Sequence, residues 1–364
     1  MVAALPAWVV TRVLVLISFG LAHLLFTALK PARYAGGLRL RQGLLAWDGE
    51  WFHRIATEGY AALPPPSLRY FPLLPALGRG LGTLLAGNVG LALVVLANAF
   101  ALLAGALLYR LVVRETGDER LARRATWVLA LAPPSFVLVM AYTESLAILL
   151  AVAAFLALRG RRWWWAALAG YLSGLARPLG VLLSLPAAME GLPGLRGDPP
   201  RQRLARLAAI GAPLAGCATY LAWVWIRFGD PLLPYSSQQT SDFRGGFANP
   251  LVTLAKTAVD LAAGRFATKN VPHLPWAVLL IVLVVVVCRR WPAPYGAFAA
   301  ATLLVALSTE RLGSLERYVF ACFPVLLAIA SLTESERVER IVLVLGGVVM
   351  TVYATLTFLA VYVP

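Results

Sequence analysis

An acid among tryptophans and an isolated arginine are the residues with the clearest capacity for chemistry. Asp48 lies between Trp47 and Trp51, where a carboxylate is costly unless it is used or paired. Arg177 interrupts an apolar run. Arginine at membrane depth costs about 2.5–3.5 kcal/mol on insertion scales, and it usually faces a cavity, an anion or an ion-pair partner. Together these residues indicate a site for an anionic substrate that is carried by a lipid.

Other polar residues lie at predicted helix ends. Arg311 and Arg317 have the guanidinium fork that suits a phosphate, although they can also pair with neighbouring glutamates. Tyr142 and Glu144 occupy a tight turn, where an acid at the head of a helix is also favourable as a cap. Gln238 lies in a long polar segment. We therefore keep both a substrate-binding and a structural interpretation of these residues.

The segment around Asp48 predicts an amphipathic helix. Trp47, Trp51 and Ile55 share one face at helical spacing, while Glu50 and Arg54 form an i,i+4 pair on a polar face. Tryptophan is favoured at the membrane interface, so we expect this helix to lie there. An anchoring role accounts for the tryptophans but leaves the acid between them unexplained.

The elements that must position these residues are membrane helices. The chain of 364 residues is 60% hydrophobic and 13% charged, which predicts an all-α polytopic membrane protein with one membrane domain over 1–364. Its net charge of +15 is explained by basic cytoplasmic loops, so we expect membrane lipids and no nucleic acid as partners. The clear candidate helices are 6–28, 88–109, 124–140, 142–158, 204–226, 274–289, 293–309, 318–333 and 341–362.

Two further apolar runs depend on the orientation of the chain. With the N-terminus cytoplasmic, the arginine-rich loops fall inside only if 163–190 is a hairpin of two short helices that turns near Arg177. The run 71–86 then dips into the outer side or lies in the interface. This arrangement gives about eleven membrane helices. It places two large loops, 29–87 and 227–273, on the outer side together with the candidate residues.

Six short motifs follow one another between residues 45 and 320. They are Trp47-Asp48-x-x-Trp51-Phe52-x-x-Ile55-Ala56-x-x-Gly59-Tyr60, Phe71-Pro72-x-x-Pro75, Tyr142-Thr143-Glu144-Ser145-Leu146, Ala176-Arg177-Pro178-x-Gly180, Gly229-Asp230-Pro231 and Glu316-Arg317-Tyr318. In this order they resemble the motifs of the PIG-V-like mannosyltransferases, the GPI mannosyltransferase 2 family. The resemblance implies a GT-C glycosyltransferase fold.

The resemblance also implies an inverting transfer of a sugar, most readily mannose, from a polyprenyl-phosphate donor. Asp48 would be the general base, with Glu50 as its rival. On a helix these two side chains point about 200° apart, so they cannot serve the same cavity. Arg177, Arg317 and, more weakly, Arg311 would bind the donor phosphate. The residues expected to bind the sugar or the acceptor are Trp47, Trp51, Tyr60, Tyr142, Glu144 and Gln238.

No metal or cofactor is expected. The three histidines (His23, His53 and His273) are scattered, and a phosphate that leaves already esterified to a lipid carries less charge than a nucleotide diphosphate. The compact, arginine-rich chain is typical of a bacterial protein in the cytoplasmic membrane, with its site facing outward. Bacteria do not generally make GPI anchors, so the acceptor is expected to be another lipid or glycolipid. The alternatives are a flippase for lipid-linked sugars and an accessory membrane subunit, neither of which needs Asp48.

Overall fold

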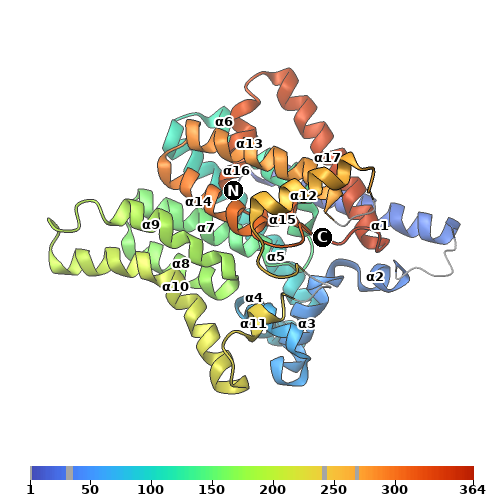
Figure 1. Ribbon diagram of the computed structural model, residues 1–364, viewed down its shortest axis with the longest axis horizontal. Coiled ribbons are helices and arrows are strands. Elements are labelled where there is room, and N and C mark those ends of the chain that lie inside the picture. Colours follow the sequence, from blue (N-terminus) through green and yellow to red (C-terminus); the bar gives the residue numbers. More distant parts are fainter. Residues whose placement is uncertain (1, 30–35, 240–243, 267–269) are drawn as a thin grey trace. The chain divides into compact units, whose positions relative to one another are not determined.

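The computed structural model describes residues 2–29, 36–239, 244–266 and 270–364, and its regular elements are helices (Figure 1). Within these residues, five helices are long and apolar enough to cross a membrane. They are α1 (Leu5–Leu29), α5 (Val89–Thr116), α10 (Pro200–Phe228), α13 (Leu274–Arg290) with the turn before it, and α17 (Glu336–Phe358). The all-α polytopic architecture is thereby confirmed, while the total of about eleven membrane segments stays a prediction.

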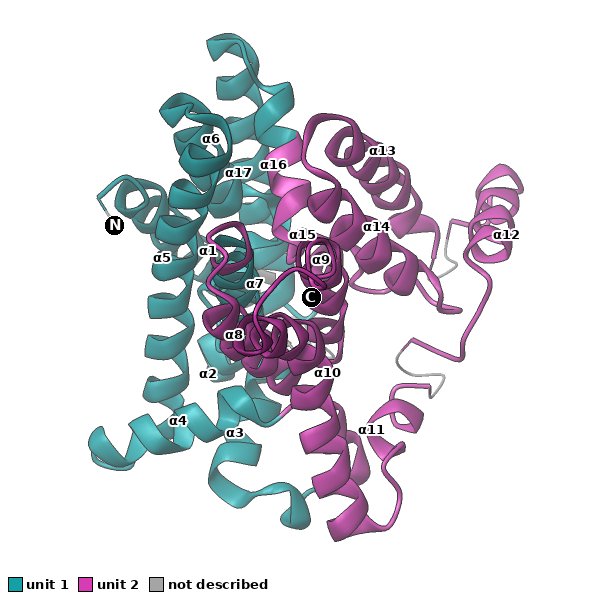
Figure 2. Ribbon diagram, turned by 90° about the vertical axis from the view of Figure 1, so that its left-hand side faces the viewer, with its two compact units in different colours: residues 1–63, 72–156, 329–364 teal, residues 64–71, 157–328 magenta. Residues whose placement is uncertain are grey.

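The chain divides into two compact units (Figure 2). Unit 1 comprises residues 1–63, 72–156 and 329–364, and unit 2 comprises residues 64–71 and 157–328. Unit 1 therefore contains Asp48 and both ends of the chain, whereas unit 2 contains the candidate phosphate-binding arginines.

Unit 1 is assembled around helices that are distant in sequence. Ser18 on α1 donates a hydrogen bond to the Thr351 carbonyl oxygen on α17 (3.2 Å), and Thr355 donates one back to the Ser18 carbonyl oxygen (3.4 Å). α17 also crosses the end of α6 (Glu119–Leu131) closely, because a Cβ at Gly346 would collide with the Leu131 carbonyl oxygen. Small residues at such crossings let helix backbones approach one another in a membrane.

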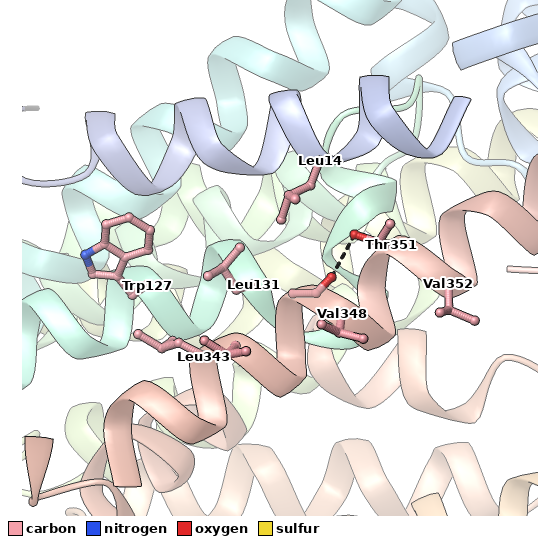
Figure 3. Close-up of a pocket in the computed structure, with 9 residues that line it drawn as sticks. Leu14, Trp127, Leu131, Leu343, Val348, Thr351 and Val352 are labelled. Atoms are coloured by element: carbon pink, nitrogen blue, oxygen red, sulfur yellow. Dashed lines mark hydrogen bonds between the residues drawn. The ribbon is translucent and has the colours of Figure 1, made fainter. Parts of the chain in front are cut away.

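An apolar hollow of 490 Å³ lies between α1, α6 and α17 (Figure 3). Its lining includes Leu14, Leu131 and Val348. The hydroxyl group of Thr351, which also lines it, donates to the Gly347 carbonyl oxygen at 2.8 Å. This lining suits a hydrocarbon chain and does not provide the acid or the arginines that a sugar phosphate requires.

Two helices predicted as single elements are interrupted at prolines. The segment 124–140 forms α6 up to Leu131 and then the 3₁₀ helix η4 (Pro133–Leu138). The segment 318–333 forms α15 (Leu315–Phe320) and α16 (Phe323–Leu332), with Pro324 in the first turn of the second helix. Proline lacks an N–H donor and its ring clashes with the carbonyl four residues earlier, so an uninterrupted helix was the wrong expectation at both places.

In unit 2, the predicted break near Arg177 is present. α8 (Trp163–Ala176) ends there, and the chain continues as η5 (Pro178–Leu183) and α9 (Ser184–Gly191). η5 turns back against the end of α8, since a Cβ at Gly180 would collide with the Ser173 carbonyl oxygen. The apolar run is thus two helical pieces joined by a turn, as the arginine distribution predicted.

α8 is fixed by backbone contact with α10. A Cβ at Gly174 would collide with the Pro213 carbonyl oxygen, and one at Gly216 would collide with the Tyr171 carbonyl oxygen. The two helices therefore meet main chain to main chain, with no room for a side chain at either glycine. This contact sets the position of the residues that follow Gly174.

Both predicted outer loops contain helices. The segment 29–87 includes α2 (Gly36–Gln42), η1 (Gly43–Leu45), α3 (Asp48–Glu58), η2 (Tyr60–Ala62), η3 (Pro65–Arg69) and α4 (Leu73–Leu84). The segment 227–273 includes α11 (Leu233–Ser236), α12 (Pro250–Ala262) and η6 (Val271–His273). The remaining helices are α7 (Glu144–Arg159), whose residues 144–156 belong to unit 1, and α14 (Ala293–Leu307) in unit 2.

Candidate functional site

Asp48 is the first residue of α3. The preceding Trp47 has φ 61° and ψ −118°, a conformation that is strained for a residue with a side chain. Two contacts hold Trp47 there: its indole N–H donates to the Thr357 carbonyl oxygen at 3.1 Å, and the Arg39 guanidinium lies 4.2 Å from the ring centroid. Strain that is held by specific contacts is common at functional sites.

Trp47 therefore lies outside the helix, and the prediction that it shares a helical face with Trp51 and Ile55 is wrong. The turn at Trp47 rotates its side chain away from the register of α3. Ile55 and Phe52 do form a buried face of that helix, whereas Trp51 is half-buried and lies 5.9 Å from the Arg54 guanidinium.

Tyr142 joins the start of α3 to the start of α7. The Asp48 backbone N–H donates to the Tyr142 hydroxyl at 3.4 Å, and the Tyr142 side chain is fully buried. The Ala141 N–H donates to the Leu44 carbonyl oxygen at 3.0 Å, which ties the same two segments together. Unit 1 thus brings Asp48 and Tyr142 into contact, and buried Glu144 begins α7 two residues further on.

The rival acid Glu50 has a different environment. Its carboxylate pairs with Arg39 at 3.1 Å, and 39% of its side chain is exposed. Arg54 pairs with Glu58 at 3.0 Å, so the predicted Glu50–Arg54 pair is wrong. The hydrogen bond from Arg54 lowers the pKa of the Glu58 carboxyl group. Because Arg39 on α2 pairs with Glu50, Arg54 pairs with Glu58, one turn further along α3.

In unit 2, three guanidinium groups surround one aromatic ring. The Cζ atoms of Arg177, Arg244 and Arg317 lie 5.3, 4.7 and 5.2 Å from the centroid of the Tyr318 ring. The arginines come from the end of α8, from the segment before α12 and from α15. Cations are attracted to the face of an aromatic ring, so Tyr318 gathers charges that would otherwise repel one another.

A family comparison bears on these residues. Residues 36–189 match the family model of the mannosyltransferases (PIG-V). The resemblance predicted from the motifs is confirmed over this range, which contains Asp48, Tyr142, Glu144 and Arg177. The match supports a mannosyltransferase activity and therefore a glycosyltransferase. The chain has no match among curated proteins.

Arg244 and Arg317 lie beyond the part that matches the PIG-V mannosyltransferases, and their contacts come from the structure. Arg244 donates to the Ala306 carbonyl oxygen and to the Thr309 hydroxyl, and a side-chain hydrogen bond links it to Tyr318. Its Nε atom is buried without a hydrogen-bond partner. Burial lowers the pKa of the Arg244 guanidinium, and the charge of Arg317 acts in the same direction.

One acid lies next to this cluster. Glu316 has only 1% of its side chain exposed, and its carboxylate lies 3.1 Å from His273 Nδ1. Asn270 fixes the preceding loop by donating to the Glu310 carbonyl oxygen and accepting from the Leu312 N–H. The Glu316 carboxylate therefore contacts a histidine, a partner that the sequence reasoning did not name.

The structure places the other predicted residues as follows. Arg311 donates its backbone N–H to the Arg244 carbonyl oxygen (3.0 Å), and the Gln238 carbonyl oxygen accepts from the Arg244 N–H (3.4 Å). Both residues thus flank Arg244 through the main chain. Tyr60 is buried in η2 of unit 1. A sugar-binding role for Gln238, Tyr60 and Trp51 stays a prediction.

Arg244 and Tyr318 were missed by the sequence reasoning as site residues. Arg244 is separated from Arg177 by 67 positions along the chain, and nothing in the sequence between them shows that they meet. Tyr318 was noted only as the last residue of a motif. Its aromatic ring beside Arg317 is a weak signal, and it becomes informative only when the other two guanidiniums are seen around it.

Proposed function

We propose that the chain is an inverting mannosyltransferase that uses a polyprenyl-phosphate-mannose donor and a hydroxyl group of a membrane lipid or glycolipid as acceptor. The observation that carries this proposal is the PIG-V family match over the segment that holds both Asp48 and Arg177. The convergence of Arg177 and Arg317 on one ring in unit 2 supports a phosphate-bearing donor.

In the proposed reaction, the acceptor oxygen attacks the anomeric carbon of the sugar as the bond from that carbon to the phosphate oxygen breaks. Asp48 accepts the acceptor's proton, and the products are the glycosylated acceptor and polyprenyl phosphate. We assign this role to Asp48 because its backbone N–H contacts the hydroxyl of buried Tyr142, whereas 39% of the Glu50 side chain is exposed. Attack opposite to the leaving group inverts the configuration at the anomeric carbon.

The arginines act on the other end of the broken bond. As the phosphate leaves, its charge rises, and fixed guanidinium groups that meet this charge lower the barrier. We assign this role to Arg177 and Arg317. Trp51, Tyr60 and buried Glu144 are proposed to contact the sugar or the acceptor. The site is proposed to face the outer side of a bacterial cytoplasmic membrane.

The test is transfer of radiolabelled mannose from polyprenyl-phosphate-mannose to a membrane lipid extract by the purified protein. Label in the lipid product supports the proposal. A flippase for lipid-linked sugars would instead move the intact labelled donor across a vesicle membrane without forming a new product. Absence of transfer with mannose and with other polyprenyl-phosphate sugars would rule out the proposed activity.

Chelators are expected to leave this transfer unchanged. The reason is that the proposed charge stabilisation comes from arginine, and a phosphate already esterified to a lipid carries less charge than a nucleotide diphosphate. The measurement compares initial rates before and after treatment with EDTA. A loss that added Mg²⁺ or Mn²⁺ restores would contradict the expectation.

A further inference from the structure

The proposed phosphate site in unit 2 contains a third arginine besides Arg177 and Arg317. Arg244 is the third guanidinium beside Tyr318, and at 4.7 Å it has the shortest of the three distances to the ring centroid. It comes from a segment that is paired with another loop: Phe247 and Thr309 form an isolated antiparallel β-bridge. Arg244 is thus fixed by main-chain pairing and is not a freely moving surface arginine.

The groups that hold Arg244 are mainly uncharged. Its hydrogen bonds go to a carbonyl oxygen, to the Thr309 hydroxyl and to Tyr318, and one buried nitrogen of the guanidinium has no partner. The nearby acid, Glu316, attracts Arg244 electrostatically, but its carboxylate also contacts His273. Burial lowers the pKa of Arg244, so a bound anion would relieve the cost of holding this cation in place.

The charge of the phosphate changes during the proposed reaction. In the donor, the phosphate is esterified to both the lipid and the sugar and carries one negative charge. In the leaving group, it is a monoester that carries about two negative charges above its second pKa of about 6. Three guanidiniums around one ring therefore match the product better than they match the donor.

Resting on the proposed function, we propose that Arg244 is a third phosphate-binding residue and that Tyr318 is the positioning residue for all three guanidiniums. The site they form binds a lipid phosphate monoester more tightly than a lipid phosphate diester. This preference stabilises the departing phosphate as its charge develops. It also makes the spent lipid phosphate a competitor of the donor.

A binding measurement tests this inference and does not require mannose transfer. The probes are farnesyl phosphate and its methyl ester, which share a lipid chain and differ by one charge at pH 8. Isothermal titration calorimetry with the full-length protein in detergent is expected to show roughly tenfold tighter binding of the monoester. The advantage should shrink at pH 5.5, where the monoester is largely a monoanion.

The Arg244→Gln variant is expected to lose most of this monoester preference. Arg265→Gln is the matched control, because Arg265 lies in the same unit, is 64% exposed and pairs with Asp260. It removes the same charge but should keep the preference. Tyr318→Phe keeps the ring but removes the hydroxyl that bonds Arg244, so it should retain more of the preference than Tyr318→Leu, which should lose it. The comparison of two ligands on one protein sample separates binding preference from loss of folded protein.

The inference would be overturned if Arg244→Gln kept the full monoester preference, or if Arg265→Gln lost as much of that preference as Arg244→Gln. Failure of the wild type to bind either probe would overturn it as well. These results are separable from the proposed activity. Mannose transfer by wild type with an unaltered preference in Arg244→Gln would refute the inference alone. A monoester preference that depends on Arg244, without any transfer, would support the phosphate site and refute the mannosyltransferase proposal.

Discussion

Replacement of Asp48 by Asn is expected to lower mannose transfer by about 100- to 10,000-fold, the usual contribution of a general base. Asn keeps the size of the side chain but cannot accept the proton at neutral pH. The hydrogen bond from this residue to Tyr142 should remain, because it comes from the backbone N–H. Initial rates of labelled mannose transfer, together with the melting temperature, measure both effects.

Glu50→Gln is the matched control for this experiment. It removes the neighbouring carboxylate by the same chemical change, and its expected cost is limited to the ion pair with Arg39. A partly exposed pair of this kind contributes little to stability, typically below about 1 kcal/mol. Near-normal activity of Asp48→Asn would rule out the assignment of the base. Equal loss in both variants would show that the segment, and not the single carboxylate, is required.

Replacement of Gly174 by Ala is expected to destabilise unit 2 by about 1–3 kcal/mol, the usual cost of overpacking. The new methyl group would collide with the Pro213 carbonyl oxygen on α10, and the Cys217 backbone nitrogen would be 2.9 Å away. Both are main-chain atoms, so no side chain can move aside, and α8 and α10 must separate. Arg177 lies three residues beyond Gly174, so the phosphate site should be displaced as well.

Thermal melting in detergent and farnesyl phosphate binding measure these two consequences. Gly211→Ala on α10 is the control, because a Cβ there meets nothing within 4 Å. It makes the same chemical change on one of the two helices and should lower neither the melting temperature nor farnesyl phosphate binding, since Ala favours a helix over Gly. An unchanged melting temperature in Gly174→Ala would show that the two helices do not depend on this close approach.

The sequence predicted the helical elements well where a single physical signal dominated. Long apolar runs identified α1, α5, α10, α13 and α17, because membrane burial requires about 20 apolar residues. The distribution of arginines across loops predicted the break near Arg177, which hydropathy alone does not show. The interruptions at Pro133 and Pro324 were not predicted, because both prolines lie within apolar runs long enough to indicate one continuous helix.

The candidate site was less accessible to sequence reasoning. The contact of Asp48 with Tyr142 joins segments separated by 94 positions. The motifs identified both residues as candidate site residues without showing that they meet. The Glu50–Arg54 ion pair was predicted wrongly because Arg54 has an acid four residues away on either side, Glu50 and Glu58. Glu50 pairs with Arg39 across a loop, a choice that depends on tertiary structure. The position of Arg244 also depends on tertiary structure, since it is set by pairing with residues around Thr309.

The discontinuity of unit 1 has a consequence for biosynthesis. α1 is made first, but its partner α17 follows all of unit 2, and Ser18 and Thr355 are 337 positions apart. At about 5–20 residues per second, a ribosome takes roughly 15–60 seconds to make the chain between these helices. Throughout that interval α1 lies in the bilayer without the helix that accepts its serine hydrogen bond. Unit 2 can fold while the chain is still growing, whereas the packing of unit 1 cannot be completed until α17 has been made.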